Sequence, residues 1–130
     1  MHLHGELRKV RSIEDESLVY KWEEDLTLDD KNEFNHQLRP HIVWFGEEVP
    51  LLYDATQIVE LADILVIIGT SMQVYPAASL IHYVKSGTPI YFIDPNPAIS
   101  SSSHENLTII KKTAVEGTKE LIRLLNVENS

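Results

Sequence analysis

Four short runs of β-branched and aromatic residues constrain the fold of this chain more than any other feature. They cover residues 42–45, 64–68, 90–93 and 107–110. Each run is apolar at consecutive positions rather than at alternate ones. This pattern is typical of strands that are covered on both faces in a parallel sheet. The sequence therefore predicts four buried parallel strands.

Helical patterns lie between and after these runs. The first helix is indicated by apolar residues that share one helical face, namely Ala55, Ile58, Val59 and Ala62. A second, over residues 76–86, is bracketed by Pro76 at its first position and Gly87 at its left-handed exit. A capping box from Thr113 to Glu116 begins the third, whose expected apolar face consists of Val115, Leu121, Ile122 and Leu125. This alternation predicts a doubly wound α/β fold.

Acidic residues are concentrated between Glu14 and Glu33. This segment holds nine acidic and two basic residues, and thus most of the net charge of −9. The composition changes near Arg39 and Pro40, where the apolar runs begin. We predict a small acidic insert over residues 11–37, and an α/β part made of residues 1–10 and 38–130. The acidic face either attracts Lys-rich proteins or is simply a solvated surface.

Composition excludes several classes of function. The net charge of −9 has the wrong sign for a nucleic-acid-binding protein. There is no apolar run of membrane-spanning length and no secretory leader, so we expect a cytoplasmic protein. The absence of cysteine excludes disulfides, thiol nucleophiles and cysteine-based zinc sites.

Small and polar residues follow the predicted strands. They include Gly46-Glu47, Gly69-Thr70-Ser71 and Asp94-Pro95-Asn96-Pro97. Ligands of parallel sheets bind at the carboxyl ends of the strands, where backbone N–H groups and hydroxyls can meet phosphate or ribose. The alternative is that these are ordinary strand-to-helix turns, which favour the same residue types. The sequence contains no Gly-x-Gly-x-x-Gly or Walker loop, so the expected site is of a general nucleotide type.

The same residues carry a resemblance to a known family. Leu3-His4-Gly5, the run from Leu38-Arg39-Pro40 to Phe45-Gly46-Glu47, the run from Gly69-Thr70-Ser71 to Val74-Tyr75-Pro76, and Asp94-Pro95-Asn96-Pro97 resemble the C-terminal half of sirtuins. The resemblance covers about residues 1–10 and 38–125. It implies a partial Rossmann-like sheet with flanking helices. The implied activity is NAD-dependent removal of acyl groups from lysine, giving nicotinamide and O-acyl-ADP-ribose.

The resemblance implies specific roles around the cofactor. His4 corresponds to the catalytic base, and a neutral imidazole suits this task at physiological pH. Gly69, Thr70 and Ser71 correspond to the loop at the adenosine side of NAD. Pro95, Asn96 and Pro97 correspond to the turn at the adenine ribose, and Ala114 to the position that closes over the adenine. The alternatives are a terminal remnant for His4 and a plain turn residue for Asn96.

The resemblance also implies how an acyl-lysine protein or peptide binds. The peptide would run as a strand between Gly46-Glu47 and Val74-Tyr75. The carbonyl group of Val43 would accept the lysine side-chain N–H, and Phe45 would line the apolar tunnel for the acyl group. Val43 and Phe45 are otherwise ordinary residues of a core strand.

Two departures from the family accompany this resemblance. Many sirtuins carry four zinc-binding cysteines in the region of the acidic insert, and this chain has none. We therefore predict no structural metal and an insert held by its own apolar residues, which are Leu18, Val19, Tyr20, Trp22, Leu26, Leu28 and Phe34.

The second departure is that the phosphate loop and the nicotinamide motif of the family's N-terminal half have no counterpart here. We expect a fragment that is inactive on its own and that has an open sheet edge, through which copies pair into homodimers or swapped oligomers. The alternative functions are a non-catalytic module that binds an adenine nucleotide or a peptide, and a plain assembly domain.

Overall fold

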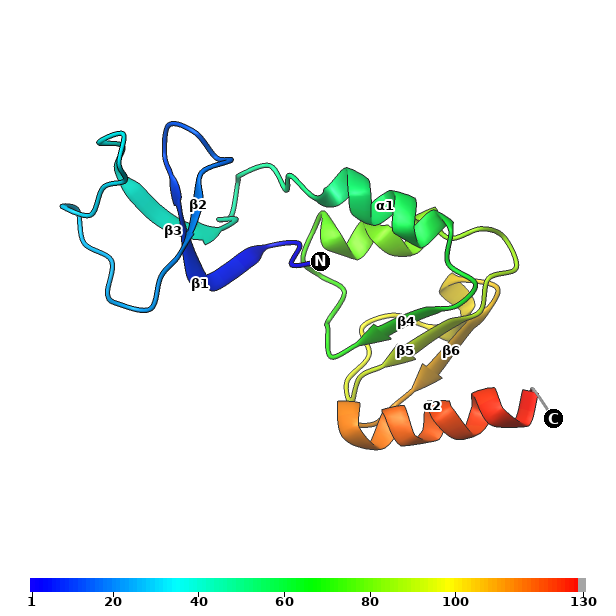
Figure 1. Ribbon diagram of the computed structural model, residues 1–130. Helices are drawn as coiled ribbons and strands as arrows, with labels where there is room; N and C mark the ends of the chain where they lie inside the picture. Colours follow the sequence, from blue (N-terminus) through cyan, green and yellow to red (C-terminus); the bar gives the residue numbers. More distant parts are fainter. Residues whose placement is uncertain (129–130) are drawn as a thin grey trace. The chain divides into compact units, whose positions relative to one another are not determined.

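The computed structural model describes residues 1–128 of the chain (Figure 1). The chain forms two compact units, Met1–Pro50 and Leu51–Ser130, which are described separately below. No helix within residues 1–128 has both the length and the apolar character needed to cross a membrane.

The first unit is built on an antiparallel sheet. Strand β1 (Gly5–Ser12) lies between β2 (Val19–Lys21) and β3 (Leu38–Ile42), in the order β2-β1-β3. Val10 is the register partner of both Tyr20 and Pro40, and the pairing of β1 with β3 is irregular between Gly5 and Val10. Strand β1 thus pairs both with a strand inside the acidic segment and with the strand that follows it. The assignment of residues 11–37 to a separate insert stays a prediction.

The predicted parallel strand over residues 42–45 is wrong. Strand β3 ends at Ile42 and is antiparallel to β1. The chain then turns, because the N–H of Glu47 donates to the carbonyl oxygen of Trp44 at 3.1 Å and Gly46 has a φ of +88°. A short apolar run does not specify its partner strand, and here the register partners lie 26 to 37 residues earlier.

Polar contacts, more than apolar packing, hold the acidic segment. Of the apolar residues expected to stabilise it, Leu28 is 87% exposed and Phe34 60% exposed, so that part of the prediction is wrong. Ser12 is fully buried instead, and its hydroxyl oxygen accepts the N–H groups of Glu14 and Asp15, both at 3.1 Å. Its proton is therefore directed to Nδ1 of His36, also at 3.1 Å.

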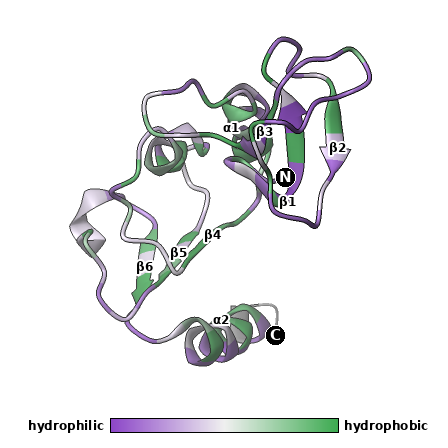
Figure 2. Cartoon of the chain, turned by 90° about the vertical axis from the view of Figure 1, so that its left-hand side faces the viewer, coloured by the Kyte–Doolittle hydropathy of each residue, from purple (hydrophilic) through white to green (hydrophobic). Residues whose placement is uncertain are grey.

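The second unit contains a parallel sheet with the order β4-β5-β6. The strands are β4 (Leu65–Ile68), β5 (Ile90–Ile93) and β6 (Leu107–Ile110). Leu65 pairs with Ile90, and Ile90 with Leu107. The three predicted strands over residues 64–68, 90–93 and 107–110 are confirmed, the first beginning one residue later. Figure 2 shows the apolar character of these strands.

Helices cover both faces of this sheet (Figure 1). Helix α1 (Leu52–Glu60) and the 3₁₀ helix η1 (Ala77–Tyr83) lie over one face, and α2 (Ala114–Glu128) lies over the other. Strand β5 serves both layers. Ile90 and Phe92 pack in one buried cluster with Ile81 of η1. Tyr91 and Ile93 pack in another with Leu121 of α2. The predicted α/β class with a Rossmann-like parallel sheet is therefore confirmed.

The helices differ from the sequence prediction in detail. Helix α1 buries Ala55 and Val59, but Ile58 is 60% exposed. The second expected helix is present as a 3₁₀ helix, and it is shorter than the predicted residues 76–86 because Val84 is already extended. A short 3₁₀ turn, η2 (Ser101–Ser103), precedes β6.

Helix α2 begins as the capping pattern predicts, since the N–H of Glu116 donates to Oγ1 of Thr113 at 3.4 Å. Its inward face is only partly as expected. Leu121 is buried, whereas Val115 is 69% exposed and Ile122 53% exposed. Gly117, Leu121 and Leu125 follow one another at intervals of four, which keeps them on one face of a helix, whereas Val115 and Ile122 fall outside it.

Candidate active site

The loops that follow β4 and β5 lie side by side at the carboxyl edge of the parallel sheet. The N–H of Gly69 donates to the carbonyl oxygen of Ile93 at 3.0 Å. The N–H of Asp94 donates to that of Ile110 at 3.3 Å. Because each bond joins the exit of one strand to the end of the next, the predicted cofactor residues Gly69–Ser71 and Pro95–Pro97 start from adjacent points. Their roles in binding stay predictions.

The Gly69–Ser71 loop has an exposed backbone in an unusual conformation. Gly69 has a φ of +64°, and a Cβ atom there would meet no other atom within 4 Å. The glycine is therefore required by its backbone angle rather than by crowding. Met72 also has a positive φ, of 57°, and its N–H donates to Oγ1 of Thr70 at 3.1 Å. With Ser71 exposed, the turn presents a small, polar surface at the sheet edge.

The next loop forms an Asx turn. The N–H of Asn96 donates to Oδ1 of Asp94 at 2.7 Å, while Pro95 and Asn96 are exposed and Pro97 is half-buried. The third predicted contact, Ala114, is exposed at the first position of α2. Both features fit a surface that receives a ligand from solvent.

Sequence reasoning missed the role of Gly117. A Cβ atom at this position would lie 2.2 Å from Cγ2 of Ile93, so only glycine lets α2 lie this close to β5. Gly117 thus fixes the height of the helix that carries Ala114 above the sheet. An isolated glycine inside a helical pattern was the available signal.

The predicted base His4 is exposed, and its backbone is fixed by the residue that follows. Gly5 has a φ of +89°, and a Cβ atom there would lie 2.0 Å from the carbonyl oxygen of His41. The carbonyl oxygen of His4 accepts the N–H of Val43 at 3.0 Å. Strand β1 therefore brings His4 next to Val43, which is the residue predicted to contact the acyl-lysine side chain.

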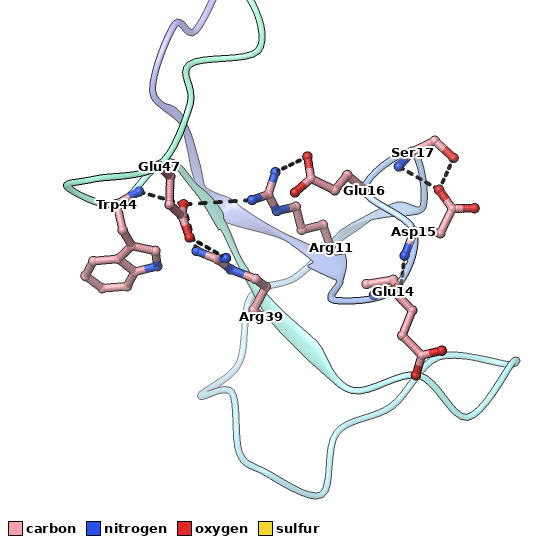
Figure 3. Close-up of polar contacts among 9 residues, drawn as sticks. Arg11, Glu14, Asp15, Glu16, Ser17, Arg39, Trp44 and Glu47 are labelled. Atoms are coloured by element: carbon pink, nitrogen blue, oxygen red, sulfur yellow. Dashed lines mark hydrogen bonds and ion pairs between the residues drawn. The ribbon is translucent and has the colours of Figure 1, made fainter. Parts of the chain in front are cut away.

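The turn after Val43 is fixed by Glu47 (Figure 3). The carboxylate of Glu47 accepts two hydrogen bonds from Arg39, at 2.7 and 3.1 Å, and one from the N–H of Trp44 at 2.9 Å. The Arg39 guanidinium, and secondarily the Trp44 N–H, lower the pKa of Glu47 below its ordinary value. Phe45 is 96% exposed, which excludes its alternative role as a core-strand residue.

The surroundings of His41 disfavour its charged form, whereas those of Glu47 favour its charged form. Burial lowers the pKa of His41 below its ordinary value, and the nearby positive charges of Arg11 and Lys9 lower it further. Within residues 1–128, its Nδ1 atom is buried without a hydrogen-bond partner. The imidazole therefore favours its neutral form.

The other predicted peptide segment, Val74-Tyr75, lies just before η1. The carbonyl oxygen of Val74 accepts the N–H of Ala78 at 2.9 Å, and the side chains of Val74 and Tyr75 are 47% and 69% exposed. This segment belongs to the second unit, whereas Gly46 and Glu47 belong to the first. A peptide strand between the two segments stays a prediction.

A parallel sheet covered by helices on both faces, with Gly- and Asn-bearing loops at its carboxyl edge, defines an α/β protein of the Rossmann-like class, in which ligand sites lie at this edge. The Sir2 family profile matches residues 1–76, which is more than half of the chain. The chain belongs to the Sir2 family.

Curated relatives include an NAD-dependent protein deacylase of Helicobacter pylori, 50% identical over 122 residues, with 94% of this chain and 52% of the relative covered. Another, of the same name, from Bacteroides thetaiotaomicron is 46% identical over 131 residues, with 96% and 56% covered. A solved Sir2 homolog–NAD complex is 33% identical with a TM-score of 0.79, covering 99% of this chain and 52% of that one. The chain thus spans about half the length of these relatives.

Proposed function

We propose that this chain supplies the catalytic base, part of the cofactor site and the peptide-binding segments of an NAD-dependent protein-lysine deacylase. The observation that carries the proposal is the hydrogen bond between the His4 carbonyl and the Val43 N–H, at 3.0 Å. It joins the predicted base to the predicted acyl-lysine contact. The names of the curated relatives and the NAD complex of the solved homologue support the same activity.

The loops at the sheet edge fit the adenosine half of NAD. The open space around Gly69 leaves room for a ligand close to the backbone, and the neighbouring turn presents the exposed Asn96. An Asn side chain offers both donors and an acceptor to vicinal ribose hydroxyls. We assign adenosine contacts to Gly69, Thr70 and Ser71, and ribose and adenine contacts to Pro95, Asn96, Pro97 and Ala114. When bound, NAD supplies an electrophilic ribose carbon with nicotinamide as its leaving group.

The residues of the first unit act on the substrate side. The exposed imidazole of His4 takes a proton from a ribose hydroxyl as a general base. The carbonyl group of Val43 orients the acylated side chain by accepting its N–H, and Phe45 offers apolar surface to the acyl group. The main chain at Gly46-Glu47 and at Val74-Tyr75 pairs with the peptide. We assign this activity to the cytoplasm, where NAD and acylated proteins coexist.

We further propose that the acidic segment needs no zinc. The hydrogen bonds of the buried Ser12 hydroxyl with the backbone and with His36 support this, because they already tie the ends of the segment together. His36 in turn approaches Glu14, with Nε2 and Oε2 3.4 Å apart. The purified chain should contain less than about 0.1 zinc per molecule after dialysis against a chelator, with an unchanged melting temperature. Zinc retained in stoichiometric amount would contradict this.

The activity is tested in a chimera in which this chain replaces the matching half of the Helicobacter pylori relative. We expect NAD-dependent deacylation of an acetyl-lysine peptide, and a loss of about a hundredfold or more in kcat in the His4→Ala variant. His2→Ala is the matched control, because His2 is also an exposed histidine near the chain start. Undiminished turnover by the His4→Ala chimera would remove His4 from its role.

A non-catalytic nucleotide-binding module is the second candidate, favoured by the open space around Gly69 and the exposed Asn96 at the sheet edge. Calorimetry of the 130-residue chain with ADP-ribose examines it directly. Binding together with an inactive chimera would favour this module over the deacylase. No heat at millimolar ligand would favour an assembly domain.

A further inference from the structure

Two arginines lie directly opposite each other in the antiparallel sheet of the first unit. Arg11 of β1 is the register partner of Arg39 of β3. Like charges at opposed positions of adjacent strands repel each other and destabilise the pair. The arrangement therefore requires a nearby anion.

Glu47 supplies this anion, as Figure 3 shows. Its carboxylate forms a two-pronged ion pair with Arg39, with Nη1–Oε1 at 2.7 Å and Nη2–Oε2 at 3.1 Å. The same Oε2 atom lies 4.0 Å from Nη2 of Arg11. Glu16 contacts Arg11 from the other side, with Oε2 and Nη1 3.2 Å apart. Two guanidinium groups are thus balanced by two carboxylates.

Because Arg11 is buried, loss of a carboxylate that balances its charge would cost stability. The Arg11 side chain is 8% exposed, and those of Arg39 and Glu47 are 26% and 34% exposed. Removing one partner of a buried charge pair leaves the other uncompensated in a medium that solvates it poorly. Because Glu16 is 64% exposed, Glu47 is the less solvated of the two balancing carboxylates.

The Glu47 carboxylate also closes a turn. Its Oε2 atom accepts the Trp44 N–H at 2.9 Å, and the Glu47 N–H donates to the Trp44 carbonyl oxygen at 3.1 Å. At the other end of the segment, the Val43 N–H is bonded to the His4 carbonyl oxygen. The segment from Val43 to Glu47 is therefore fixed at both ends.

The middle of this segment, in contrast, is exposed to solvent. Phe45 is 96% exposed, and a Cβ atom at Gly46 would meet no atom within 4 Å. We propose that Glu47 is a positioning residue, which holds the Trp44–Glu47 turn on the Arg11–Arg39 pair and so presents Phe45 and the Gly46 main chain to an acyl-lysine peptide. This rests on the proposed function and assigns to the Glu47 side chain a task separate from backbone pairing.

The test measures binding of a fluorescent acetyl-lysine peptide, and of ADP-ribose, to the complete 130-residue chain. Glu47→Ala should raise the Kd of the peptide about tenfold or more, because the Trp44–Glu47 turn loses its anchor on Arg39. Glu47→Gln keeps the size and the acceptor oxygen, so it should restore part of the affinity. Glu48→Gln, at the exposed neighbouring carboxylate, is the matched control and should leave the peptide Kd unchanged.

ADP-ribose binding serves as the fold control, because the residues assigned to it lie in the second unit. Its Kd should be the same in all variants. Arg39→Lys keeps the charge but loses the planar fork, so it should weaken peptide binding without affecting ADP-ribose. In the chimera, Glu47→Gln should raise KM for the peptide and leave KM for NAD unchanged.

Equal peptide affinity in Glu47→Ala and the unaltered chain would overturn the positioning role. A chain that binds ADP-ribose but no peptide would also overturn it, while leaving the cofactor part of the proposed function intact. A chain that binds neither ligand would contradict both.

Discussion

Gly5 and His41 approach so closely that no side chain fits between them. A Cβ atom at Gly5 would lie 2.0 Å from the His41 carbonyl oxygen and 2.8 Å from its carbonyl carbon. Both obstacles are backbone atoms of β3, which cannot rotate away as a side chain would. The contact therefore fixes how β1 enters the sheet, and with it the position of His4.

We expect Gly5→Ala to destabilise the chain by more than about 2 kcal/mol, because it combines strain at a positive φ with a clash against backbone. Urea unfolding followed by fluorescence measures the change. Gly46→Ala is the matched control: its φ is +88° but its surroundings are open, so it should lose only about 1 kcal/mol. Equal losses in the two variants would mean that the His41 contact has no effect.

Gly117→Ala should destabilise the chain by about 1–3 kcal/mol, although alanine is the better helix former. The added methyl group would meet the fully buried Ile93 side chain, with 2.2 Å between Cβ and Cγ2. Lys119→Ala, at an exposed position of the same helix, should be neutral or slightly stabilising. A more stable Gly117→Ala variant would contradict the close packing of α2 on β5.

Phe92→Ala should cost about 3–5 kcal/mol, since it empties the centre of a fully buried cluster. Phe92→Leu should cost less than Phe92→Ala, because it leaves a smaller cavity. Thermal unfolding by calorimetry provides the comparison. Val115→Ala, at a 69% exposed position, should change the melting temperature little. A Phe92→Ala loss no larger than that of Val115→Ala would disprove the central place of Phe92.

Stability should fall as the pH is lowered from 7 to 5, in part through His41. Its pKa is lowered in the folded chain, so the unfolded chain binds more protons between that pKa and about 6.5, and stability rises with pH across this window. Unfolding midpoints in urea at several pH values measure the slope. His41→Gln should flatten it, whereas His2→Gln should not.

Protonation of Glu47 causes a second loss of folding stability at lower pH. Its pKa is also lowered in the folded chain, so its contribution is complete above the unfolded value of about 4.5 and is lost as the pH falls through the folded value. Glu47→Gln should reduce the acid sensitivity below pH 4.5 and leave the slope between pH 5 and 7 as it is. A change in the upper range alone would assign the effect to another group.

Strand β4 forms an edge of the parallel sheet within the described residues, and we expect copies of the chain to associate there. Ile64, Val66 and Ile68 are 41%, 37% and 44% exposed along this segment. Light scattering after size exclusion should show dimers or larger species. Val66→Lys should shift them toward monomer, whereas Thr108→Lys on β6 should not. A monomeric unaltered chain would disprove the association.

The sequence predicted the second unit better than the first, for a physical reason. Strand β5 is buried at all four positions and β6 at Leu107 and Ile110, so each run of apolar residues identifies its own strand. In the first unit the pairing of β1 with β3 depends on contacts between distant segments, such as that of Gly5 with Ile42. Local patterns contain no information on such partners.

The candidate site likewise has one part that the sequence predicts and one part that it does not. The loop at Gly69 could be located from its position after a strand. The part played by Glu47 could not, because it depends on the register that places Arg11 opposite Arg39. The sequence shows that residues 5 and 117 are glycines, but it does not show why. The close contacts that require glycine at these positions arise only in the folded chain.

The turn between Val43 and Glu47 has one more consequence. A side chain that projects almost entirely into solvent can be exchanged at a cost of about 0.5 kcal/mol or less. Phe45 is such a side chain, while the ends of its segment are anchored elsewhere. Mutational drift at this one position would therefore leave the framework intact, so that the surface offered by this turn can diverge between descendants of one ancestral chain without a compensating change in the fold.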